Sequence, residues 1–331
     1  MIYRRRLLLS VISVLTLGSV SHTLAADTAP LRVVTTFSIL GDMVSRIGGE
    51  HIVLTTLVGP GGDAHVYRPT PAAARAMSEA DILVVNGLEF EGWLERLVDA
   101  SDFDGIQVVA TTAIEPMRYQ EIEHEDHSEG GHENEKNDDH DDDEHAGHEN
   151  HDHGTFDPHA WQSLNNAVAY VDSITAGLAT TRPESASAFY LNRATYVDEI
   201  QALNVDIRAL METLPDDART VVTSHDAFQY FGRDYNLTFL APQGLSTDSE
   251  ASAKDVASLI RQMRAEGIDA AFVENIADPR LLEQIVNETG ANIGGTLYPG
   301  ALSGPDGPAP TYLQMMRHNA TTLATALGLG G

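Results

Sequence analysis

Two sets of short apolar segments, separated by stretches of helical character, constrain the fold of this chain more than any other feature. Several segments are apolar at every position, for example residues 82–85 and 270–273. Strands with this pattern are buried on both faces, which is typical of parallel sheets covered by helices. Two sets therefore predict two α/β lobes. The predicted strands are residues 31–37, 52–58, 81–85 and 106–111 in the first lobe, and 220–224, 237–241, 269–274 and 292–298 in the second.

A long amphipathic segment lies between the two sets of strands. Its apolar residues recur at three- and four-residue steps from Phe189 to Leu214, as in a helix with one buried face. Pro183 suits the first helical turn and Pro215 ends the helix. A helix over residues 184–214 would span roughly 45 Å, and we expect it to be a rigid link. The predicted lobes are residues 27–183 and 215–331.

The first 26 residues have the features of a secretory signal peptide. Three arginines at positions 4–6 precede an apolar stretch at 7–20, and Ala25 and Ala26 form a small-residue cleavage site. The chain contains no cysteine, so no lipid anchor is expected. No later segment approaches the length of a transmembrane helix. These features predict a mature protein in a bacterial periplasm.

Residues 121–153 differ in kind from the rest of the chain. They contain eight His, fifteen Asp or Glu and one Lys, with almost nothing apolar. We expect a disordered loop, which is either an acidic spacer or a low-affinity collector of zinc. The whole chain carries 49 acidic and 20 basic residues. This balance argues against nucleic acid and anionic membranes as partners.

Three of the six histidines outside that loop have unusual sequence contexts. His65 lies in a glycine-rich loop directly after a predicted strand, and His225 ends another strand. His159 follows Pro158 in a turn that enters a helix. In open α/β sheets, ligands bind beyond the carboxyl ends of the strands. Neutral imidazole is a common zinc ligand, so the three histidines are candidates for one zinc site.

A histidine that binds a metal usually needs an acceptor for its second ring nitrogen. Asp63, Asp157 and Asp226 are each close in sequence to one of the three histidines. They are the candidate acceptors. Because cysteine is absent, any metal site must be built from His, Asp and Glu.

Four segments of the sequence point to a known family: GDAHVYRPTP, FDPHAWQSLNNAVAYV, SHDAFQYFGRDYNL and LYPGALSGPDGPAPTYLQMMRHN. They resemble the zinc- and manganese-specific solute-binding proteins of bacterial ABC importers. The resemblance covers essentially the whole mature chain. It implies two α/β lobes joined by one rigid helix, with the metal held between them. The family's first two ligands fall on His65 and His159. The third is His in zinc-type members and Glu in manganese-type members, and here it is His225.

The resemblance also implies a function. A monomeric, non-enzymatic protein would capture Zn²⁺ in the periplasm and deliver it to the permease of an ABC transporter. A zinc-donating periplasmic protein would be a further partner, although nothing in the sequence shows one. The acidic His-rich loop is a trait of zinc-type members.

The sequence departs from the family pattern at Gly300, where relatives usually place a carboxylate ligand. A water molecule, Asp306, Glu274 or a histidine of the loop at 121–153 could take the fourth position. We expect the water.

Two other functions compete with zinc transport. A zinc hydrolase also holds its metal by three ligands with an open fourth position. The chain lacks the H-E-x-x-H and G-x-S-x-G motifs. Ser224, His225 and Asp226 are contiguous, and neighbours on an extended chain point to opposite sides, so they form no catalytic triad. The other alternative is a periplasmic zinc buffer or an adhesin.

Overall fold

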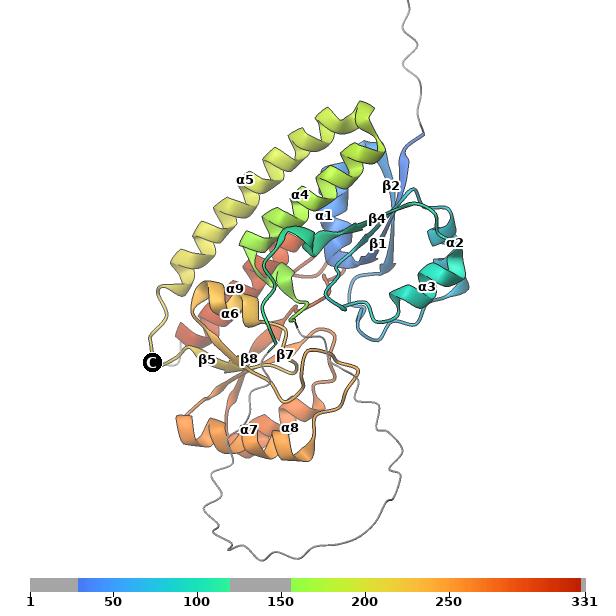
Figure 1. Ribbon diagram of the computed structural model, residues 1–331. Helices are drawn as coiled ribbons and strands as arrows, with labels where there is room; N and C mark the ends of the chain where they lie inside the picture. Colours follow the sequence, from blue (N-terminus) through green and yellow to red (C-terminus); the bar gives the residue numbers. More distant parts are fainter. Residues whose placement is uncertain (1–28, 120–155, 329–331) are drawn as a thin grey trace, which may run out of the picture.

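Two α/β lobes, each built around a four-stranded parallel sheet, make up the structure (Figure 1). The computed structural model describes residues 29–119 and 156–328. The elements of the first lobe are β1 (Leu31–Phe37), α1 (Ser38–Gly48), β2 (Ile52–Val58), α2 (Pro71–Ser78), β3 (Ile82–Val85), α3 (Leu94–Ser101), β4 (Ile106–Val109) and α4 (Leu164–Thr181). Those of the second are β5 (Thr220–Val222), α6 (Gln229–Tyr235), β6 (Thr238–Leu240), α7 (Ala253–Glu266), β7 (Ala270–Glu274), α8 (Arg280–Thr289), β8 (Asn292–Leu297) and α9 (Tyr312–Gly328).

Both sheets have the same topology. The strand orders are β2-β1-β3-β4 and β6-β5-β7-β8, and every pair is parallel. All eight predicted strands are present, and two of them match the prediction at both ends. The others are shorter by one or two residues, because the chain joins the ladder late, leaves it early, or both. After β4, for example, it turns into a 3₁₀ helix at Ala110–Ala113. In each sheet the chain adds its second strand on one side of the first strand and its third strand on the other side. A ligand crevice is therefore expected at the carboxyl ends of β1 and β3, and at those of β5 and β7.

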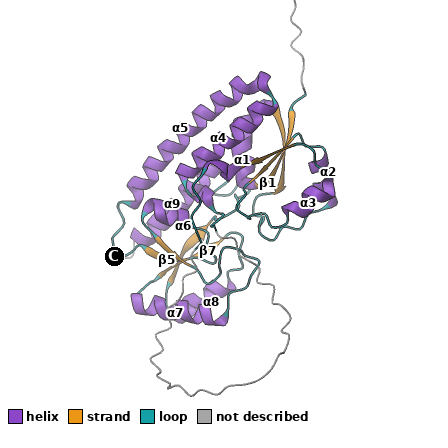
Figure 2. Cartoon of the chain, in the orientation of Figure 1, coloured by secondary structure: helices purple, strands orange, loops and turns teal. Residues whose placement is uncertain are grey.

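The predicted linking helix is α5 (Ala186–Met211), which runs along both lobes (Figures 1 and 2). It is about 39 Å long, and its first predicted residues form a separate 3₁₀ turn at Pro183–Ser185. Phe189, Tyr196 and Ile200 are buried on its inner face. The helix packs against α1 and α4 of the first lobe and against the C-terminal helix α9. The two lobes are therefore joined by a packed helix rather than by a free linker.

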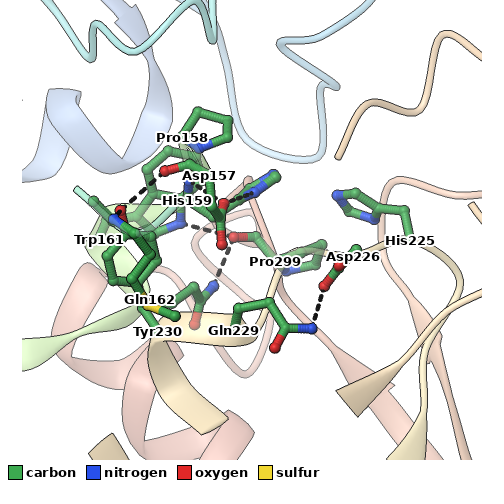
Figure 3. Close-up of polar contacts among 12 residues, drawn as sticks. Asp157, Pro158, His159, Trp161, Gln162, His225, Asp226, Gln229, Tyr230 and Pro299 are labelled. Atoms are coloured by element: carbon green, nitrogen blue, oxygen red, sulfur yellow. Dashed lines mark hydrogen bonds and ion pairs between the residues drawn. The ribbon is translucent and has the colours of Figure 1, made fainter. Parts of the chain in front are cut away.

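The lobes share one hydrophobic core. A single cluster of buried residues continues from the first sheet through Trp161 and α5 to residues of the second lobe, and a smaller cluster lies under α7 and α8. The loop after β8 is also bound to the first lobe by hydrogen bonds. The carbonyl oxygen of Pro299 accepts from Trp161 Nε1 at 2.8 Å and from Gln162 Nε2 at 2.7 Å (Figure 3). Shared packing and buried hydrogen bonds of this kind make the lobes one unit along this side.

Two predicted segments lie outside the described residues: the signal peptide at 1–26 and the His-rich loop at 121–153. Within residues 29–119 and 156–328, no helix is long and apolar enough to cross a membrane.

Candidate metal centre

His65 lies in the loop that follows β2. Gly61 in this loop has a φ of +71°, a conformation that glycine adopts without strain. Its N–H donates to the carbonyl oxygen of Leu302 in the second lobe at 2.9 Å. Asp63 accepts the backbone N–H of His65 at 2.9 Å and the hydroxyl of Thr247, from the second lobe, at 2.5 Å. The position of His65 is thus set by contacts with both lobes.

His159 is held by Asp157, two residues earlier. One oxygen of Asp157 accepts the backbone N–H of His159 at 2.9 Å and lies 2.8 Å from its Nδ1 (Figure 3). Tyr230 of α6 donates its hydroxyl to the carbonyl oxygen of Asp157 at 3.0 Å. On the other side, Ser163 caps the N-terminus of α4 by accepting from the N–H of Asn166. His159 is completely buried.

His225 extends the line of β5 and makes an isolated parallel bridge with Gln243. Its orientation is set by Glu274, the last residue of the neighbouring strand β7. One oxygen of Glu274 accepts from the backbone N–H of Ser224 at 2.9 Å and of His225 at 3.1 Å. The other lies 2.5 Å from Nδ1 of His225. His225 is also completely buried.

The structure brings the three histidines together. One ring nitrogen of each can be chosen so that all three lie within 4.8 Å of one another. The Nε2 atoms of His65 and His159 are 3.2 Å apart, and two imidazole nitrogens on one tetrahedral zinc ion lie ~3.3 Å apart. The Nε2 atom of His225 is buried and has no hydrogen-bond partner. A buried ring nitrogen without a partner is costly unless a ligand occupies its lone pair.

A cavity of about 530 Å³ opens between the lobes beside these residues. Asp63 and Val66 line it from the first lobe, and Ser224 and Thr247 line it from the second. The histidines that neighbour these residues, His65 and His225, therefore lie next to a cleft between the lobes. This is the position expected for a ligand at the carboxyl ends of the strands.

Burial and mutual proximity change the pKa values of the cluster. Burial holds the pKa values of His65 and His159 well below the usual 6.5. The positive charge that His225 would carry lowers both pKa values further, and that of His159 also lowers the pKa of His65. Burial also acts to lower the pKa of His225, but the carboxylate of Glu274 outweighs it, and the pKa is raised. Burial raises the pKa of Asp157 to about 7. His65 and His159 are therefore neutral at neutral pH, with lone pairs free for a metal.

The structure narrows the choice of a fourth ligand. Among the described residues, the group that could hold a metal contains these three histidines and no carboxylate. Glu274 already binds His225 and two backbone N–H groups. Asp306 is exposed in a turn closed by the Gly307 N–H and the Gly304 carbonyl oxygen. A histidine of the loop at 121–153 lies outside the described residues, so of the predicted candidates a water molecule fits the described site best.

Sequence reasoning identified one of the three acceptors correctly. Asp157 does contact the ring of its histidine, as predicted. Asp63 instead accepts a backbone N–H, and Asp226 accepts from the side-chain amide of Gln229 at 2.6 Å. The acceptor for His225 is Glu274, a residue that the sequence suggests only as a fourth ligand. Glu274 is 49 residues away in sequence from His225. It could have been found from the sheet topology, because Glu274 ends β7, which pairs with the strand β5 that leads to His225.

Comparisons with known proteins identify the family of this chain and agree with its two-lobe fold. Residues 33–326 match the family described as zinc-uptake complex component A, periplasmic. The manganese-binding lipoprotein MntA of Halalkalibacterium halodurans is 30% identical over 302 residues, covering 91% of this chain and 90% of the relative. The iron-binding protein YfeA of Yersinia pestis is 28% identical, covering 96% and 93%. The structure of the periplasmic zinc-binding protein TroA of Treponema pallidum has a TM-score of 0.77 at 26% identity, covering 90% and 99%.

Proposed function

For this chain, which belongs to the family of periplasmic components of zinc-uptake complexes, we propose that the metal is Zn²⁺, because its candidate ligands are three imidazoles. The family places the chain outside the cytoplasm as the substrate-binding component of an ABC metal importer. The proposed site consists of His65, His159 and His225. The cognate permease would receive the ion. No catalytic step is needed for this task, and we assign none.

The choice of zinc rests on one observation, the convergence of three imidazoles with no carboxylate among the described donors. Imidazole nitrogens suit zinc, whereas manganese prefers oxygen ligands. The names of relatives refer to manganese and iron as well as zinc, so family membership alone does not select the metal. The donor set of this chain is what favours zinc.

The two carboxylates behind the cluster support the same proposal. With Nδ1–H of His159 donated to Asp157 and Nδ1–H of His225 donated to Glu274, both rings keep the lone pair of Nε2 for the ion. The same two hydrogen bonds restrict rotation of these rings before the ion arrives. The site is therefore prepared for a cation and needs little rearrangement.

We further propose that the segment at 121–153 supplies zinc to this site through weak binding to its eight histidines. The disordered chain of 33 residues that the composition predicts would explore roughly 30 Å and would keep captured ions at about millimolar concentration near the cluster. The cluster would set the final affinity, and the segment would set the rate of loading. The absence of a lipid anchor and the cleavage of residues 1–26 also remain predictions.

Zinc titration of the mature protein and of a form lacking residues 121–153, followed by native mass spectrometry, tests the proposal. We expect one tightly bound zinc in the shortened form, several more weakly bound ions in the full form, and slower loading after the deletion. Competition with Mn²⁺ and Fe²⁺ on the shortened form should leave zinc bound. Displacement of zinc by equimolar Mn²⁺ would refute the metal assignment, and unchanged loading would refute the role of the segment.

We expect zinc affinity to decrease as the pH falls below about 7. His225 and Asp157, whose pKa values are raised, hold their protons in the metal-free protein up to a higher pH than usual. Zinc binding requires their deprotonated forms, so protons compete increasingly as the pH falls through this range. His65 and His159, whose pKa values are lowered, add to the competition only in stronger acid.

Competition with a chelator of known pH dependence, measured between about pH 8 and about pH 5, would check this. The onset of weakening should lie near pH 7. An affinity that stays constant until the pH is well below 6.5 would show that His65 and His159 dominate the competition instead.

A further inference from the structure

The turn after β3 has an unfavourable backbone conformation. Gly87, Leu88 and Glu89 have positive φ angles of 90°, 54° and 62° in succession. Glycine adopts this region freely, but Leu88 and Glu89 do so only when surrounding structure holds them there. Glu89 is exposed, so its side chain has little packing with which to hold the turn. The stabilising contacts must come from elsewhere.

Those contacts come from Glu91, whose side chain is buried. Its Oε1 accepts from the hydroxyl of Thr36, on β1, and from the N–H of Asn86, both at 2.7 Å. Its Oε2 accepts from the N–H of Gly87 at 3.3 Å. The Phe90 N–H closes the turn by donating to the carbonyl oxygen of Gly87 at 3.2 Å. One carboxylate therefore joins the end of β1 to the start of the left-handed turn.

The same turn contacts the histidine cluster at two places. The ring centroid of Phe90 lies 4.7 Å from that of His65, edge to face, and 6.0 Å from that of His159. The side-chain amide of Asn86 donates to the carbonyl oxygen of Pro158, directly before His159, at 2.9 Å. A displacement of the turn would therefore move the support of two of the three imidazoles.

The second lobe has a matching arrangement. Glu274 lies where the sheet changes direction, between β5 and β7, and it accepts from two backbone N–H groups as well as from the ring of His225. Glu91 lies at the equivalent edge of the first sheet, between β1 and β3. Glu274 contacts a histidine directly, whereas Glu91 acts through Phe90 and Asn86.

We propose that Glu91 is a positioning residue for metal binding, which holds the left-handed turn at 87–89 and thereby fixes Phe90 and Asn86 against the histidines. The inference rests on the proposed function of the cluster. It assigns a role to a buried carboxylate that is neither a ligand nor a partner of a ligand's ring.

Glu91→Gln tests this with little change in shape. A carboxamide has one oxygen, so its NH₂ group must face either the N–H of Gly87 or that of Asn86, and the turn loses at least one of its bonds. Glu89→Gln is the matched control, because it makes the same chemical change at an exposed position of the same turn. We expect zinc affinity to fall about tenfold or more in Glu91→Gln, as for other residues that orient metal ligands, and to stay unchanged in Glu89→Gln.

Two further measurements separate positioning from general loss of structure. Co²⁺, used as a spectroscopic probe, should show altered visible absorption in Glu91→Gln, because the geometry of the imidazoles changes. Adding Glu89→Gly to the same chain relaxes the turn and should restore part of the zinc affinity. If Glu91→Gln does not fold, Thr36→Val removes one hydrogen bond to the same carboxylate and should weaken zinc binding by a smaller factor.

The outcomes distinguish the two proposals. A wild-type protein that binds no zinc at the cluster would overturn the proposed function. A wild-type protein that binds zinc, with Glu91→Gln or its substitute Thr36→Val equal to Glu89→Gln, would overturn the role of Glu91 alone. Weaker binding with an unchanged Co²⁺ spectrum and no recovery by Glu89→Gly would also overturn it, since that pattern indicates only a loss of stability.

Discussion

Replacing His65 with alanine will reduce zinc affinity by more than the ~10–100-fold that follows loss of a residue orienting a metal ligand. His65 is the most informative of the three positions. Removing His159 or His225 would leave the buried carboxylates of Asp157 or Glu274 without their ring contacts. The ring of His65 instead contacts Phe90 and the other two histidines. The metal-free protein should therefore keep its stability.

Thermal unfolding with and without zinc measures the loss of zinc affinity in His65→Ala and in a control variant. At a zinc concentration 100 times the wild-type Kd, binding adds about 2.7 kcal/mol of stability, and a 100-fold weaker variant retains only about 0.4 kcal/mol. His51→Ala removes an imidazole that lies outside the cluster, next to Phe189, and should keep the full zinc-dependent stabilisation. Equal stabilisation of His65→Ala and His51→Ala would exclude His65 as a ligand.

Gly300→Asp is expected to tighten zinc binding by about tenfold or more, because a carboxylate would add a charged fourth ligand to the three imidazoles. A Cβ atom at Gly300 would meet its nearest neighbours, Ile276 and Trp161, at 3.7 and 3.9 Å, which are ordinary contacts. The ring of Trp161 packs against that of His159, so the new side chain starts close to the proposed site. Without metal the buried carboxylate would have no cation to offset its desolvation, and the apo protein should be less stable.

Gly300→Asn is the matched control, since it has the same size without the charge. Calorimetric titration with zinc would show the tighter binding of Gly300→Asp. Unfolding of the metal-free proteins would show its lower stability. If Asp at this position binds zinc no more tightly than Asn, the carboxylate does not reach the ion. The present Gly300 would then have no bearing on zinc affinity.

The fold was predictable because its signals are local. Fully apolar strands such as β3, the helical spacing along α5 and the prolines at either end of the linking helix are all visible within a few residues of sequence. Parallel strands need crossover connections, and this requirement reduces the possible topologies to a few. Errors were confined to the ends of elements, where one or two residues lie outside a ladder or form a 3₁₀ turn, and where α5 ends at Met211, three residues before the predicted end at 214.

The sequence by itself determined the two lobes, the rigid link and the three histidines as candidates, since each depends on neighbouring residues or on the motifs around them. Only the tertiary structure placed Nε2 of His65 3.2 Å from Nε2 of His159. It also made Glu274, rather than Asp226, the partner of His225. These contacts join residues 49 or more positions apart. No local pattern encodes them, because they arise from the pairing of β5 with β7 and from the packing of the two lobes along α5.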